Sequence, residues 1–358
     1  MQHYIDKNGN VWKSHPNIQS GRRRQADVIR QYSGPRRCAY KDSIVDTWQL
    51  FFPDELLQRI VDHPNAHVST IDPNMHFDLV SFKAFIAILY WRGASRDQTI
   101  STEDLWSSDG APFYKSAMSR SLFRDWLRFL RFDDKNTRQE RTVTDTFAAI
   151  SDVWNEWNDR LPQFFNASYS ITVDEQLVSS RSRSPHRVYN PAKPGKYGEL
   201  IRWSADSQHR YMYKGKPWTK RPEDVAAKET HIESNKAKNL VLDLVLPFYG
   251  TGRNVTGDRF FTSLSLAEEL LTKRLTYVGT IMSNRRVIPP VLHEVQAVEH
   301  SQFAFGGRDN QVTLAVYQAK PTKKSLHAID YAPRQADTRR LSWKNRNTTG
   351  VQSDKGRS

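Results

Sequence analysis

Cysteine and long apolar runs are the two features that this sequence has least of. Cys38 is the only cysteine among 358 residues, which excludes an intrachain disulfide and any zinc cluster built from several cysteines. No stretch reaches the roughly 18 consecutive apolar residues of a membrane-spanning helix. Residues 1–30 contain no apolar core followed by a cleavage site, so no secretory signal is recognised. We therefore expect a soluble, intracellular protein.

Two frequent cofactor motifs are missing as well. The 11 histidines are scattered, and no HExxH spacing is present, which argues against zinc. No glycine-rich GxxxxGK[ST] loop is present, so the sequence does not indicate ATP binding.

Basic charge is abundant and is concentrated in three segments. Lysine and arginine total 53 against 39 acidic residues, a net charge of +14. Residues 21–42 carry a net +5, residues 179–221 a net +9 and residues 320–358 a net +7, so the rest of the chain carries −7. Segregated basic charge indicates a polyanionic partner, with nucleic acid first. An anionic membrane surface, or solubility alone, is the alternative.

The spacing of apolar residues changes near Ser170. Apolar side chains recur at helical spacing over residues 46–165, whereas short β-branched runs alternate with helical segments over residues 166–324. The predicted fold class is therefore α+β, an all-helical region followed by a mixed α/β domain. Residues 1–45 and 325–358 have little periodicity, and we expect a basic, largely disordered arm and a disordered basic tail.

Two aspartates occupy matching positions in the predicted α/β domain. Asp174 ends one predicted strand and Asp258 ends another. If these strands are neighbours, both carboxylates emerge at one sheet edge, where oxygen ligands suit Mg²⁺ or Mn²⁺. Two such ions would assist phosphodiester displacement. An aspartate at a strand end is also common without any metal, and the residues alone leave both interpretations open.

Several motifs then resemble those of piggyBac-type DDE transposases, in the family's order and over about residues 8–324. They are Thr172–Val178 (TVDEQLV), Tyr189–Gly198 (YNPAKPGKYG), Gly252–Ser263 (GRNVTGDRFFTS) and Tyr277–Ile281 (YVGTI). Asp174 matches the family's first catalytic metal ligand and Asp258 its second. Arg259 stands where the family usually has asparagine after the second acid.

The resemblance implies a function as well as a fold. It implies a ribonuclease-H-like domain with a β-rich insertion at about 287–320, after a helical DNA-binding and dimerisation region at 46–165. It also implies Mg²⁺-dependent excision and integration of double-stranded transposon-end DNA by a nuclear homodimer. The basic residues that we expect to contact DNA are Arg22, Arg23, Arg24, Arg187, Lys193, Lys196 and Arg259.

The family pattern breaks after about Lys324. A third catalytic aspartate is expected after the insertion, but Asp330, Asp337 and Asp354 do not lie in that motif. The family's cysteine-rich zinc-binding tail is not found either, so no zinc is expected. We therefore expect a C-terminally truncated, transposable-element-derived protein with impaired or no catalysis. The alternative is a domesticated, non-catalytic DNA-binding or interaction protein.

Overall fold

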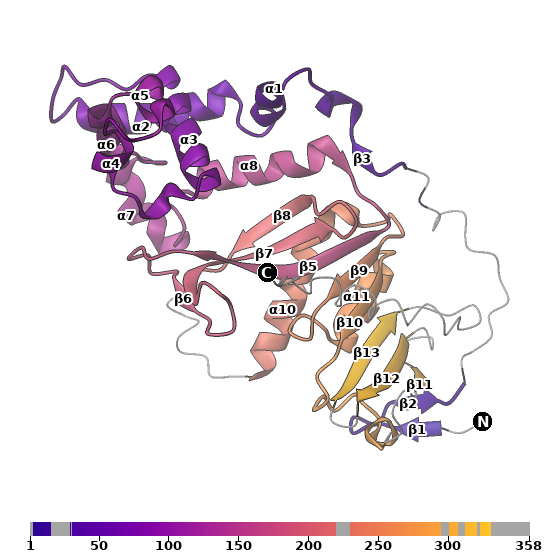
Figure 1. Cartoon of the computed structure of the whole chain (residues 1–358). Coiled ribbons are helices and arrows are strands. Elements are labelled where there is room, and N and C mark those ends of the chain that lie inside the picture. The colour runs from indigo at the N-terminus through magenta and orange to yellow at the C-terminus, as the bar shows by residue number, and fades with distance from the viewer. Residues whose placement is uncertain are drawn as a thin grey trace, which may run out of the picture. The chain divides into compact units, whose positions relative to one another are not determined.

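The computed structural model of this chain describes residues 3–15, 29, 31–219, 230–294, 301–306, 312–320 and 323–330. The chain divides into two compact units (Figure 1). Unit 1 comprises Met1–Arg30, Tyr169–Asp174 and Glu229–Ser358, and unit 2 comprises Gln31–Ser168 and Glu175–Lys228. The expected DNA-contacting residues Arg22, Arg23 and Arg24 lie outside the described residues.

Unit 2 begins with a run of helices. Their bounds are α1 Ile44–Gln49, α2 Asp54–Val68, α3 Leu79–Ala94, α4 Thr102–Leu105, α5 Pro112–Ala117, α6 Arg120–Phe129, α7 Lys135–Thr144 and α8 Ser151–Phe164. Several begin at a side-chain cap, as at Asp78 and Ser119, which accept hydrogen bonds from backbone N–H groups of the first turn. The apolar stripes of α2, α3 and α6 meet in one core that is rich in aromatic rings, including Phe85, Phe123 and Trp126.

Helix α8 joins this bundle to a β-hairpin of the same unit. The hairpin consists of β7 (Tyr197–Asp206) and β8 (Met212–Pro217), with β6 (Val188–Tyr189) antiparallel to β7. The Asn158 side chain of α8 exchanges two hydrogen bonds with the backbone of Gly215 in β8, at 3.2 and 2.7 Å. Trp154 packs against Trp203 of β7, with ring centroids 5.7 Å apart. The helical segment and the hairpin therefore form one packed body.

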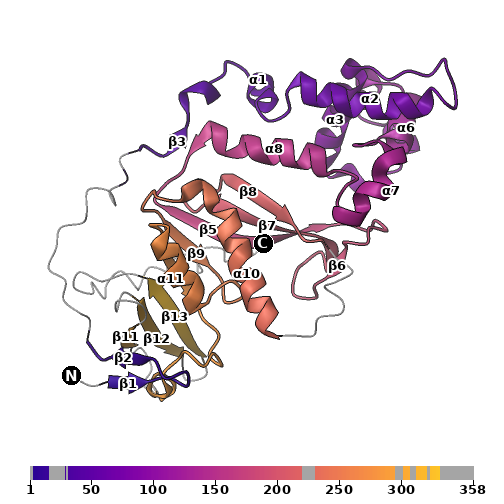
Figure 2. The same cartoon turned by 180° about the vertical axis from the view of Figure 1, so that it is seen from behind.

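Unit 1 is a mixed sheet with helices on one face. The strands in their spatial order are β1 (His3–Ile5), β2 (Val11–Lys13), β11 (Ser301–Gly306), β12 (Val312–Lys320), β13 (Lys323–Asp330), β10 (Thr276–Thr280), β9 (Asn254–Gly257) and β5 (Ser170–Ser179). β5, β9 and β10 are parallel, whereas β13 is antiparallel to β10. Helices α10 (Thr230–Leu244) and α11 (Leu264–Thr272) lie over one face beside β9 and β10 (Figure 2).

The remaining elements are short. They are β3 (Gly34–Pro35) paired with β4 (Phe165–Asn166), and the 3₁₀ turns η2 (Arg37–Ala39), η3 (Asp97–Thr99), η4 (Leu246–Phe248) and η5 (Pro290–His293). Strand β5 belongs to both units, because its first five residues lie in unit 1 and its last five in unit 2. The α+β class expected from the sequence is confirmed by these helices and sheets. No helix of the described residues is long and apolar enough to cross a membrane.

The expectation of disordered ends is wrong where the structure describes them. β1 and β2 form a hairpin that pairs with β11, and Trp12 of β2 is fully buried. Asp6 accepts hydrogen bonds from Trp12 Nε1 at 3.2 Å and from the Asn10 side chain at 2.8 Å. At the other end, residues 325–330 belong to strand β13, whereas residues 331–358 lie outside the described residues. Pairing with distant strands, rather than local periodicity, orders these segments.

Candidate functional site

Two neighbouring parallel strands place the two predicted acids at one edge of the sheet in unit 1. The parallel register of β5 and β9 ends at Val173↔Gly257, so Asp174 and Asp258 each come one residue later. Neighbouring strands lie about 4.8 Å apart, which suits a pair of cations about 4 Å apart. Both side chains are exposed. The structure therefore brings together the two acids that the sequence singled out.

A tight turn after β9 orients the Asp258 carboxylate. Its Oδ1 accepts hydrogen bonds from the backbone N–H of Phe260 at 2.9 Å and of Phe261 at 3.4 Å. The Asp258 carbonyl accepts further bonds from Thr262, from N–H at 3.1 Å and from Oγ1 at 2.6 Å. An aspartate that bonds its own backbone two residues on is a frequent way to begin a turn. The negative charge is thus exposed while its position is fixed.

A buried tyrosine supports this turn from below. Tyr277 of β10 is fully buried, and its hydroxyl lies 2.8 Å from Thr262 Oγ1. It also passes over Gly257 and Gly279, where a Cβ atom at either position would collide with the Tyr277 ring or hydroxyl. Burial raises the pKa of Tyr277, and the nearby Asp258 charge raises it further, so the hydroxyl stays protonated at neutral pH.

The donor set suits a hard divalent cation, and the described part of the chain brings two carboxylates to this edge. Mg²⁺ takes oxygen ligands and is usually held by one or two carboxylates. Among the residues that the structure describes, no group of three or more His, Cys, Asp or Glu side chains is placed to hold a metal ion. Asp174 and Asp258 thus fit part of a two-metal site.

The strand register places residue 330 away from this pair. Thr280 of β10 is level with Asp258 and is registered with His327 of β13. Because β13 runs antiparallel to β10, Asp330 lies three residues further toward the opposite edge, registered with Val312. Three residues of a strand cover about 10 Å, which is too far for a shared cation site. The other two tail acids, Asp337 and Asp354, lie outside the described residues.

The expected DNA-contacting residues of unit 2 lie around the β6–β7 connection. Arg187 is exposed, donates to the Ser182 carbonyl at 2.9 Å and lies 5.6 Å from the centroid of the Tyr197 ring. Lys196 is exposed in a turn, with a positive φ of 51°. Both cations are therefore held on the surface, where a polyanion can reach them.

The other two described cations differ from each other. Lys193 is half-buried, and its Nζ donates to the Glu175 carbonyl at 3.2 Å, with Glu175 Oε1 3.9 Å away. Much of its charge is thus committed to the residue that follows Asp174. Arg259 is exposed in the turn directly after Asp258. Arg259 directly follows one of the two acids in the chain, whereas Arg187, Lys193 and Lys196 belong to unit 2.

Comparisons with known proteins identify the family and the fold. A family model described as transposase IS4 matches residues 44–349. A solved chain from a "piggyBac transposase synaptic complex with hairpin DNA" is 33% identical, with a TM-score of 0.76 over 84% of this chain. The present chain spans 63% of the length of that one. This likeness supports the ribonuclease-H-like fold. The family match also continues beyond residue 324, where the motif-by-motif resemblance ended.

Proposed function

Because the chain belongs to the transposase IS4 family and is of the piggyBac type, we propose that it binds double-stranded transposon-end DNA through its basic surfaces. We further propose that Asp174 and Asp258 form part of a site for cutting and rejoining DNA. The observation that carries this proposal is the parallel register that sets both acids at one sheet edge. The similar solved chain is part of a complex with hairpin DNA, which supports the choice of DNA as the partner.

Mg²⁺ or Mn²⁺ is the proposed cofactor, held by the carboxylates of Asp174 and Asp258. Such an ion stabilises charge on the attacking and leaving oxygens of a phosphodiester. The protein's contribution is to hold the carboxylates still, which the Phe260 N–H does for Asp258 at 2.9 Å. We propose that Arg259, which is exposed in the same turn, binds a phosphate of the strand that is cut.

We propose that the 358-residue chain by itself is a weak strand-transfer enzyme. The resemblance calls for three catalytic acids, and the register supplies two. Losing a ligand that stabilises the transition state costs several kcal/mol, and each 1.4 kcal/mol is about tenfold in rate. DNA binding depends on other residues and is expected to remain.

The test is a cleavage and binding assay on duplexes that carry transposon ends, with Mg²⁺ or Mn²⁺. We expect binding that weakens steeply with salt, because lysine and arginine displace counterions, and cleavage that is barely above that of the Asp174→Asn variant. Efficient excision lost in Asp174→Asn would contradict the impaired-enzyme proposal while supporting the site. Binding without any cleavage would favour the second candidate, a non-catalytic DNA-binding protein. Absence of DNA binding would contradict both the impaired-enzyme proposal and the second candidate.

Dimerisation and nuclear location are parts of the same proposal. The family resemblance implies a homodimer, which a mass measurement in solution with and without DNA would detect. The basic run at residues 21–24 suits a nuclear address. A fluorescent fusion that stays outside the nucleus would contradict that part alone.

A further inference from the structure

A basic cavity lies in the helical bundle of unit 2, where α6 ends and α7 begins. Its volume is about 320 Å³. Four cationic side chains line it, from Arg128, Arg131, Lys135 and Arg138, together with the apolar Leu130 and Phe132. No carboxylate lines it. A concave wall of four positive charges without a negative one is suited to an anion.

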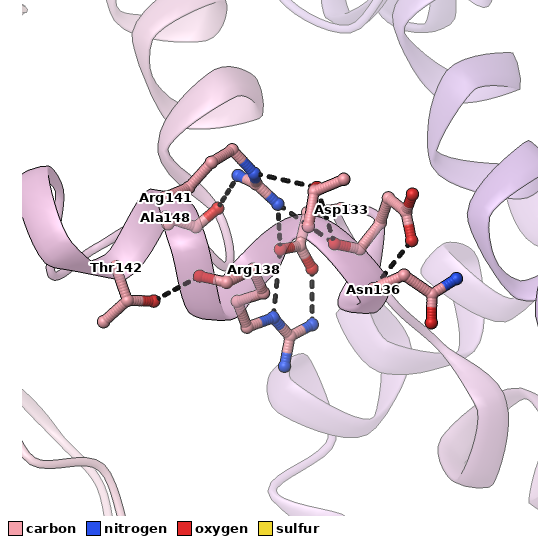
Figure 3. Close-up of polar contacts among 8 residues, drawn as sticks. Asp133, Asn136, Arg138, Arg141, Thr142 and Ala148 are labelled. Carbon is pink, nitrogen blue, oxygen red and sulfur yellow. Dashed lines mark hydrogen bonds and ion pairs between the residues drawn. The ribbon is translucent and has the colours of Figure 1, made fainter.

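A buried aspartate behind this wall fixes one of the cations. The Asp133 side chain is only 2% exposed and forms ion pairs with both Arg138 and Arg141 (Figure 3). Arg138 Nε donates to Asp133 Oδ2 at 3.0 Å, and Arg141 Nη2 donates to the same oxygen at 2.6 Å. Arg141 also donates to the Ala148 carbonyl at 2.8 Å. One carboxylate thus organises two guanidinium groups, and this cluster keeps a net positive charge.

The other three cations of the wall differ from Arg138 in their ion pairing. Among the residues that the structure describes, the ion pairs found do not include Arg128, Arg131 or Lys135. Arg128 lies over the Phe129 ring, with Cζ 4.9 Å from its centroid, which leaves its hydrogen-bond donors available. Their uncompensated charge has an effect on a neighbour. Burial lowers the pKa of His67, and the charges of Arg131 and Lys135 lower it further.

We propose that this cavity binds a backbone phosphate of DNA. Guanidinium groups present paired N–H donors that match phosphate oxygens, and a lysine adds a mobile point charge. The cavity is larger than one phosphate and leaves room for the bridging waters that are common at such contacts. A phosphate contact fixes the position of the duplex without reading its sequence. This inference rests on the proposed DNA binding and adds a contact on the helical bundle to those expected near β6–β7 and Arg259.

The sequence held a weak signal for this site. The four cations are spaced three, four and three residues apart, as on one helical face, although the helix breaks between α6 and α7. Charge counting missed them because Asp133 and Asp134 lie in the same segment and halve the local excess of positive charge. Only the fold shows that Asp133 is buried behind the wall.

The experiment compares two double variants that each lose one arginine and one lysine charge. Arg131→Gln/Lys135→Gln removes charge from the cavity. Arg124→Gln/Lys115→Gln is the matched control, because both residues are exposed on helices of the same bundle and neither lines the cavity. Affinity for an end-bearing duplex is measured by fluorescence anisotropy at several salt concentrations, after circular dichroism has shown that all three proteins fold alike.

We expect the cavity variant to bind more weakly at every salt concentration. Each lost phosphate contact makes the negative slope of log affinity against log salt shallower by about 0.9, so the loss of the one phosphate bound in the cavity should change the slope by about 0.9. The control should keep the wild-type slope. The same loss on two unrelated sequences would support a backbone contact. Equal behaviour of the two double variants, whether both weaken binding or neither does, would overturn the proposal.

A second measurement needs no DNA and separates the two proposals. Inorganic phosphate is titrated at constant pH while the His67 ring signals are followed by NMR. We expect saturable shifts in the wild type and the control, and none in Arg131→Gln/Lys135→Gln. If the wild type binds no duplex, the proposed function fails, yet a phosphate response of this pattern would still support an anion site. Absence of the response in the wild type would count against the cavity.

Discussion

Asp133 in unit 2 and Asp258 in unit 1 are used in opposite ways. Asp133 is buried against two arginines, whereas Asp258 is exposed, and the described hydrogen bonds to its carboxylate come from backbone N–H groups of its own turn. Burial alone would raise the pKa of Asp133, but hydrogen bonds from Arg138 and Arg141 outweigh it, so the pKa lies below its ordinary value. One carboxylate stabilises the fold, and the other keeps its charge available for a ligand.

The comparison is tested most strongly by removing the buried charge. We expect Asp133→Asn to lower the free energy of unfolding by about 3 kcal/mol, because two guanidinium groups lose their common partner. This lies at the low end for a buried pair, since the arginine side chains are 34% and 32% exposed. Urea unfolding followed by tryptophan fluorescence measures it. Glu140→Gln, an exposed acid on the same helix α7, is the control and should change little.

The ion pairs of Asp133 with Arg138 and Arg141 also predict that the free energy of unfolding depends on pH. Because the folded-state pKa of Asp133 is lowered, its contribution is present above the ordinary carboxyl pKa and is lost as the pH falls through the folded-state value. The stability gap between wild type and Asp133→Asn should therefore stay constant from pH 7 to about pH 4 and close below it. A gap that stays open in strong acid would show that packing, rather than charge, causes the loss.

The next largest effect on the free energy of unfolding is expected for Gly257 and Tyr277, which support the turn at Asp258. A Cβ atom at Gly257 would collide with the Tyr277 hydroxyl, so Gly257→Ala should cost about 2 kcal/mol by overpacking. Tyr277→Phe alone should cost about 1 kcal/mol, since Thr262 loses a partner. The double variant should recover part of the loss, because the hydroxyl that collides is gone. Strictly additive costs would mean that these two groups do not meet.

The exposed acids Asp174 and Asp258 should affect stability through a bound cation rather than through contacts within the fold. We expect Mg²⁺ or Mn²⁺ at ten times its Kd to raise the stability of the wild type by about 1.4 kcal/mol, measured as a rise in the thermal midpoint. Asp174→Asn/Asp258→Asn should lose this rise and, without the cation, be at least as stable as the wild type, because like charges no longer repel. Asp62→Asn/Glu140→Gln removes two exposed acids elsewhere and should keep the response.

The smallest expected effect is on His67. In Arg131→Gln/Lys135→Gln its pKa should rise toward the ordinary histidine value, because both of the charges that lower it are gone. An NMR titration of the ring signals measures the change. The pKa should remain somewhat low, since burial is the largest cause and is unchanged. An unaltered pKa would mean that the cavity charges do not reach His67.

Local pattern was sufficient for parts of the site and not for others. Asp174 and Asp258 could be found because each ends a short β-branched run, and their motifs pointed to the family. The arrangement of Tyr277 over Gly257 and Gly279 could not be found in the same way, because it depends on how two parallel strands pack. Arg131 and Lys135 were missed because charge was summed along the chain instead of over a surface.

The order of residues was enough to establish the fold class, the helical stripes, the strand ends that carry the two acids and the excess of basic charge. Folding in three dimensions was needed to show that the hairpin containing Trp12 pairs with β11, and that of two adjacent aspartates Asp133 is buried while Asp134 caps α7. The physical reason is range. Periodicity and capping act between residues a few positions apart, whereas strand pairing and burial of charge depend on segments that meet only after folding.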